Sequence, residues 1–123
     1  NGMGLHYPGL HRTENGDYKY KAHEVWKKVY GGLVIENVVQ ALARIVVMKQ
    51  LLQCRDWLLT LKLKKGEVAR VSMMTYDEIV CCVPARYADK TLAQMIKFMR
   101  TPPPGFEGLP LDAEGGWDRK YSK

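Results

Sequence analysis

Two adjacent carboxylates are the residues of this sequence best placed to do chemistry. Asp77 and Glu78 lie between two stretches rich in β-branched residues, and no glycine or proline separates those stretches. This pattern predicts a tight β-hairpin within residues 67–84 with both acids at its tip. Adjacent carboxylates repel each other and lose hydration when apolar strands hold them, so a positive group is expected to compensate.

A divalent cation would supply that positive charge. Mg²⁺ (or Mn²⁺) takes oxygen ligands, commonly one or two carboxylates with water and substrate phosphates in the remaining positions. Asp77 and Glu78 are therefore the candidate metal ligands and catalytic residues, and the basic surplus of the chain suits a phosphate-bearing substrate. The alternative is an ordinary solvated turn.

A long apolar segment would carry a second set of polar residues. Residues 33–52 are apolar nearly all round and too numerous for one strand, so they predict a buried helix about 30 Å long. Glu36, Gln40 and Arg44 recur every fourth residue, with Asn37 beside them. They form one polar stripe on the helix, which must face either water or a polar ligand.

Turn residues and hydrophobic periodicity predict the remaining elements. They are a hairpin from residues 3–7 and 18–21, a short helix over 22–30, a helix capped by Asp89 and stopped by Pro102, and a last strand over 109–114. Together they predict a single α+β domain over 1–123. In it a small antiparallel sheet carries the acidic hairpin and packs on one long and one or two shorter helices.

Composition narrows the class of protein. The 123 residues are 46% hydrophobic and carry a formal charge of +6, which predicts a globular domain with a polyanionic partner. No run of about 18 consecutive apolar residues is present, so no membrane partner is expected. Glycine-rich phosphate loops, nucleophile elbows and Cys-His pairs are absent as motifs, which gives no support to nucleotide hydrolysis or covalent catalysis.

Cysteine and lysine positions add two expectations. Cys54, Cys81 and Cys82 are an odd set with an adjacent pair, which predicts buried thiols in a reducing, cytoplasmic compartment. Lys62, Lys64 and Lys65 precede Gly66 in a predicted loop, which would contact a phosphate backbone or remain solvated.

Seven segments in one consistent order resemble the C-terminal end of the family A DNA polymerases, especially those of phages and phage-like elements. They are Leu5-His6-Tyr7-Pro8-Gly9, Tyr30-Gly31-Gly32, Glu36-Asn37-Val38-Val39-Gln40-Ala41-Leu42-Ala43-Arg44, Tyr76-Asp77-Glu78-Ile79-Val80, Thr101-Pro102-Pro103-Pro104-Gly105, Gly108-Leu109-Pro110-Leu111 and Glu114-Gly115. The resemblance covers essentially the whole chain. It implies the C-terminal part of a polymerase palm and two-metal transfer of a nucleotide from a dNTP to a primer 3′-hydroxyl.

The resemblance also assigns roles. Asp77 matches the palm carboxylate that binds metal, and Glu78 matches its neighbour. Gln40 matches a glutamine that touches the minor groove of primer-template DNA, and Glu36, Asn37 and Arg44 belong to the same DNA-facing stripe. Tyr76 replaces the usual histidine before the acids, which changes the expected contact with the primer terminus, and Ile45 replaces an acid.

Part of the family pattern has no counterpart here. The second metal-binding aspartate and the fingers helix lie upstream of every matched segment, so the isolated chain is expected not to polymerise. The remainder of the polymerase (upstream palm, fingers and thumb) is then a required partner, in a bacterial or phage-infected cell. The alternatives are a non-catalytic DNA-binding module and a small phosphodiesterase that adds Asp112 and Glu114 as ligands.

Overall fold

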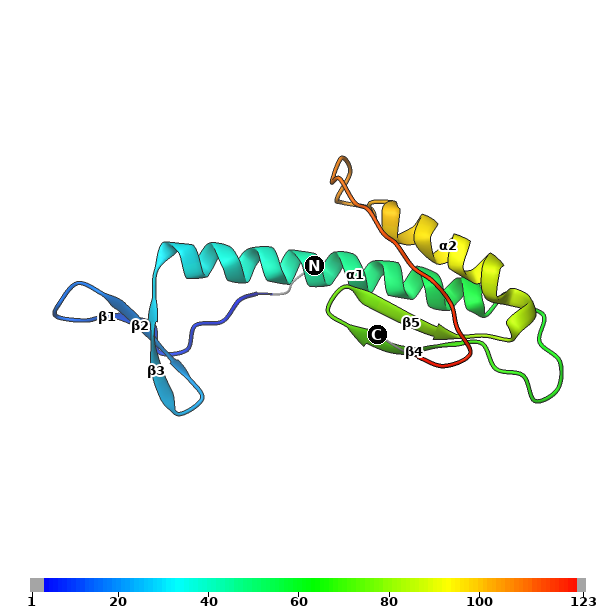
Figure 1. Cartoon of the computed structure of the whole chain (residues 1–123). Helices are drawn as coiled ribbons and strands as arrows, with labels where there is room; N and C mark the ends of the chain where they lie inside the picture. Colours follow the sequence, from blue (N-terminus) through cyan, green and yellow to red (C-terminus); the bar gives the residue numbers. More distant parts are fainter. Residues whose placement is uncertain (1–3, 122–123) are drawn as a thin grey trace. The chain divides into compact units, whose positions relative to one another are not determined.

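The computed structural model describes residues 4–121, which divide into two compact units between Ala43 and Arg44. Both contain antiparallel strands, and the long helix α1 begins in the first unit and ends in the second (Figure 1). The chain is therefore α+β with two small antiparallel sheets and two α-helices. The predicted antiparallel sheet that carries the acidic hairpin is present, and the structure adds a separate three-stranded sheet to it.

A three-stranded sheet makes up most of the first unit. Its strands are β1 (His11–Arg12), β2 (Tyr18–Ala22) and β3 (Val25–Val29), paired antiparallel in that order. The helix predicted over 22–30 is wrong. His23, with a φ of 55°, helps to reverse the chain between β2 and β3, and the resulting pairing decides the conformation of Val25–Val29.

The first predicted strand is also misplaced. Residues 4–7 are not in a strand, and Met3 lies outside the described residues. The strand before β2 that pairs with it is β1. The chain nevertheless follows the edge of β2 before β1 begins, since the amide of Lys21 donates a 2.8 Å hydrogen bond to the carbonyl of Pro8.

The predicted long helix is confirmed as α1 (Gly31–Leu58), which extends beyond 33–52 at both ends. The expectation that its apolar residues are mostly buried is wrong. The buried residues recur every fourth position and form one stripe: Val46, Gln50, Cys54 and Leu58. Apolar residues of the N-terminal half are exposed instead, with Ile35 66% exposed, and so are Val38, Val39 and Leu42.

The length and composition of α1 also satisfy the criteria for a membrane-spanning helix, which the sequence prediction did not anticipate. Core helices of soluble proteins and signal sequences satisfy the same criteria.

The acidic hairpin belongs to the second unit and has the predicted form. β4 (Arg70–Thr75) and β5 (Glu78–Cys82) pair antiparallel, with an irregularity between Val71 and Met73. Thr75 pairs with Glu78, so only two residues connect the strands.

After the hairpin come a 3-10 turn, η1 (Ala85–Tyr87), and the helix α2 (Ala88–Arg100), which ends before the three prolines as predicted. The capping role expected for Asp89 is wrong, because Tyr87 occupies the N-cap. Asp89 instead accepts a 2.7 Å hydrogen bond from the indole Nε1 of Trp117.

The strand predicted over 109–114 does not form. Pro110 has no amide hydrogen to give to a sheet. Asp112 forms an ion pair with Arg100 at 2.7 Å, which ties this extended segment to the end of α2. In Figure 1 the segment runs from the end of α2 back past the hairpin.

The core of the second unit lies between the C-terminal half of α1, α2 and β5. Buried side chains come from all three: Cys54 and Leu58 of α1, Ile79 of β5, and Ala88 and Thr91 of α2. Burial raises the pKa of the Cys54 thiol to about 11 and that of the half-buried Cys81 to about 12. The expected burial of all three cysteines is wrong for Cys82, which is exposed.

Candidate metal and nucleic-acid site

The tip of the acidic hairpin is an exposed two-residue loop. Tyr76 has a φ of 53°, in the left-handed region, and its side chain is 87% exposed. Asp77 is also exposed, and among residues 4–121 its side chain has no hydrogen bond or ion pair. The expectation that apolar strands strip water from this carboxylate is therefore wrong for Asp77, which remains accessible to a ligand.

Glu78 begins β5 and is half-buried. Its Oε2 atom accepts a 3.4 Å hydrogen bond from the hydroxyl of Tyr121, which lies 43 residues further along the chain. The C-terminal segment therefore reaches the acidic hairpin. Sequence reasoning missed this contact, because no local spacing relates Tyr121 to Glu78.

The two carboxylates suit Mg²⁺ or Mn²⁺ as hard oxygen ligands. Within the described range, however, no group of three or more His, Cys, Asp or Glu side chains is placed to hold a metal ion. The two further acids considered for a phosphodiesterase do not complete the set, and Asp112 is paired with Arg100. A metal at Asp77 would take its remaining ligands from water, phosphate or another polypeptide.

The polar stripe of α1 is exposed at three of its four members: Glu36, Gln40 and Arg44. The amide Nε2 of Gln40 donates to the Oε1 of Glu36 at 3.0 Å, so these two side chains are held side by side. Such a pair offers an amide oxygen and a carboxylate to a ligand that approaches the helix.

Asn37 has a different role within the first unit. It is half-buried and donates a 3.0 Å hydrogen bond to the hydroxyl of Tyr7. Tyr7 in turn packs edge-to-face on Tyr20 of β2, with 5.1 Å between the ring centroids. Asn37 thus connects α1 to the sheet, and this contact uses one of the two N–H groups of its amide.

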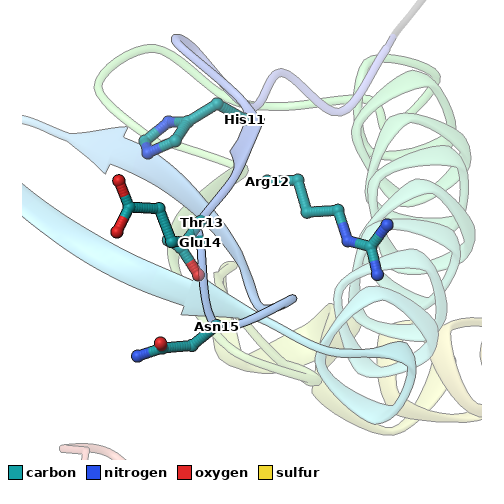
Figure 2. Close-up of a pocket in the computed structure, with 5 residues that line it drawn as sticks. All are labelled: His11, Arg12, Thr13, Glu14 and Asn15. Atoms are coloured by element: carbon teal, nitrogen blue, oxygen red, sulfur yellow. The ribbon is translucent and has the colours of Figure 1, made fainter.

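A pocket in the first unit lies at the turn between β1 and β2 (Figure 2). Its lining comes from five consecutive residues, His11 to Asn15, and Figure 2 shows the side chains of His11 and Arg12 on opposite sides of the strand. Thr13 donates its hydroxyl to the carbonyl of Asp17, and His11 Nδ1 lies 2.9 Å from the carbonyl of Gly9. These contacts serve the turn itself and bring no acid-base pair together.

Comparisons with known proteins add no information about the candidate site. No family model, curated protein or solved structure matches the chain.

Proposed function

We propose that this chain is the C-terminal palm portion of a family A-type DNA polymerase and takes part in template-directed DNA synthesis as one part of a larger enzyme. The observation that carries this proposal is the two-residue reversal that presents Asp77, without a partner in the described part of the chain, next to Glu78. The ordered resemblance of seven segments to this family supports it independently.

Each candidate residue has a task in this function. Asp77 would hold the metal, and Glu78, positioned by Tyr121, would shape the site beside it. Gln40 would contact the minor groove of primer-template DNA through the amide oxygen that its hydrogen bond to Glu36 leaves available. When bound, Mg²⁺ (or Mn²⁺) would activate the primer hydroxyl and stabilise the leaving pyrophosphate.

Two observations support the need for a larger enzyme. The chain brings no third metal-ligating side chain to the acidic pair within residues 4–121, which leaves room around a metal for water, substrate phosphate or a ligand from another polypeptide. The N-terminal half of α1 exposes neighbouring apolar side chains, which in water favours coverage by another protein surface. The upstream palm, fingers and thumb would supply both.

The second candidate function is a non-catalytic DNA-binding module. The same incomplete ligand set favours it, because the exposed stripe of α1 would contact a duplex without any metal. The two functions differ in their dependence on divalent ions.

The deciding experiment measures binding of the 123-residue chain to a fluorescent primer-template duplex with and without Mn²⁺. We expect Mn²⁺ to increase the affinity, Asp77→Asn to abolish the increase, and Asp56→Asn, at another exposed aspartate, to leave it intact. If the DNA affinity of the unmodified chain were the same with and without Mn²⁺, the chain would be the non-catalytic DNA-binding module. Templated primer extension by the isolated chain would contradict the proposal that the chain needs the rest of a larger enzyme.

A further inference from the structure

A loop at the open end of the β4–β5 hairpin is held in place by one arginine and one tyrosine. Arg86, in η1, donates hydrogen bonds to both carboxylate oxygens of Glu67. It also donates to the carbonyl of Lys62 at 3.2 Å, and the hydroxyl of Tyr87 donates to the same carbonyl at 2.8 Å. Contacts from η1 therefore fix residues 62 and 67, the two ends of a segment that we name the lysine loop (residues 62–67).

The interior of the lysine loop is also fixed by hydrogen bonds. The amide of Lys64 donates to Oε2 of Glu67 at 2.6 Å, and the amide of Glu67 donates to the carbonyl of Lys64 at 3.0 Å. Gly66, with a φ of 85°, provides the left-handed residue that this turn requires. The backbone of the loop is thus ordered before any partner binds.

The charge of the loop is not balanced within it. Lys62, Lys64 and Lys65 are all exposed, and no ion pair engages any of them in the part of the chain that the structure describes. The single acid of the loop, Glu67, is bound by Arg86 instead. Three neighbouring ammonium groups therefore remain available on an ordered backbone.

The position of the loop separates it from the acidic tip. Residues 68–69 and the six residues of β4 connect the two, and at about 3.3 Å per residue the strand alone spans about 20 Å. The carboxylates therefore lie at one end of β4, and the exposed ammonium groups of the lysine loop lie beyond its other end. Arg70, exposed at the start of β4, adds a further cation to the basic end.

We propose that the lysine loop is a contact site for the phosphate backbone of a nucleic acid, distinct from the acidic tip. The choice of nucleic acid among polyanions rests on the proposed function. Lysine ammonium groups bind phosphates as point charges, and each phosphate neutralised releases counterions. Because the loop is already ordered, binding would lose less conformational entropy than it would with a flexible basic segment.

The test is fluorescence anisotropy of duplex DNA with the 123-residue chain, without divalent ions, between about 50 and 200 mM KCl. One variant carries Lys62→Gln, Lys64→Gln and Lys65→Gln. The control carries Lys27→Gln, Lys90→Gln and Lys97→Gln, which removes the same charge from exposed positions outside the loop. We expect the loop variant to lose about tenfold or more in affinity and about two to three units of the log-log salt slope. The control should stay within about threefold of the unmodified chain, and circular dichroism should show both variants folded.

Equal losses in the two variants would overturn the inference, because net charge alone would explain them. If the loop variant bound DNA as tightly as the unmodified chain, the inference would be overturned. The proposed function would still stand if Mn²⁺ increased the DNA affinity of the unmodified chain and Asp77→Asn abolished that increase. If the unmodified chain bound no DNA, both would fail. Loop-dependent binding to phosphatidylserine vesicles, with DNA binding unaffected, would identify an anionic membrane surface as the partner and overturn the inference.

Discussion

The side-chain amide of Gln50, in α1, donates a 2.9 Å hydrogen bond to the backbone carbonyl of Met99, in the last turn of α2. Gln50 is 2% exposed, so this bond lies inside the second unit. It provides a hydrogen-bond donor for a carbonyl in the last turn of α2, because the last four carbonyls of a helix have no backbone N–H partner within the helix. The contact joins two helices that are 49 residues apart in sequence.

Replacing Gln50 with leucine is expected to lower the free energy of unfolding by about 1–3 kcal/mol, because it leaves the carbonyl of Met99 without its donor. Urea denaturation followed by circular dichroism would measure the change. Gln53→Leu is the matched control on the same helix, since the Oε1 atom of Gln53 is buried without a hydrogen-bond partner. The control is expected to be neutral or stabilising, and an equal loss in both variants would contradict the role of Gln50.

Adjacent leucines at the end of α1 should differ sharply in their contribution to stability. Leu58 is 2% exposed and Leu59 is 74% exposed. Leu58→Ala removes buried methyl groups and leaves a cavity, so we expect a loss of about 2–5 kcal/mol, whereas Leu59→Ala should change stability by less than about 0.5 kcal/mol. Denaturant midpoints of the two variants would check this. Similar values would show that Leu58, and with it the buried stripe of α1, is not part of the core.

The ion pair of Glu67 and Arg86 makes stability depend on pH in the acid range. Hydrogen bonding to Arg86 lowers the pKa of Glu67 from its ordinary value of 4.5 to about 2. The stabilisation is therefore present above about pH 4.5 and is lost as the pH falls towards 2. Thermal midpoints of the unmodified chain and of Glu67→Gln should differ most above pH 4.5 and converge near pH 2. A difference that is constant across this range would exclude titration of Glu67 as the cause.

Cysteine alkylation should be selective in the folded chain. Burial raises the pKa of Cys54 to about 11 and that of Cys81 to about 12, so both remain thiols near pH 8, whereas Cys82 is exposed. Iodoacetamide at that pH should add one label, on Cys82, and should add three after unfolding in urea. Intact mass spectrometry with peptide mapping would identify the sites. Rapid labelling of Cys54 in the folded chain would contradict its burial.

Tyr76 stores backbone strain at the tip of the acidic hairpin. A left-handed residue other than glycine or asparagine is less stable by about 1–2 kcal/mol, and the side chain of Tyr76 is too exposed to recover this through packing. We expect Tyr76→Asn to raise the free energy of unfolding by up to about 1 kcal/mol and Tyr76→Val to lower it. Chemical denaturation would measure both changes, and a loss in the asparagine variant would show that the tyrosine ring itself stabilises the fold.

The acidic hairpin, the long helix and the end of α2 were predictable from local sequence. Each depends on a strong local signal: β-branched residues on both sides of Asp77, a run of apolar residues too long for a strand, and the prolines that follow Arg100. The strand β3 was not predictable, because the apolar spacing of Val25 and Val29 also suits a helix and only pairing with β2 decides between the two.

The chemical groups available to this protein follow from its residue order: a pair of acids at a strand reversal, a polar stripe on a helix and a basic loop. Tertiary structure decided which of these groups are available to a ligand. Glu67 is bound by Arg86 and Glu78 contacts Tyr121, while Asp77 and the loop lysines have no such partner among the described residues. Contacts between residues 19 or 43 positions apart leave no periodic mark in the chain, because they depend on how the elements pack.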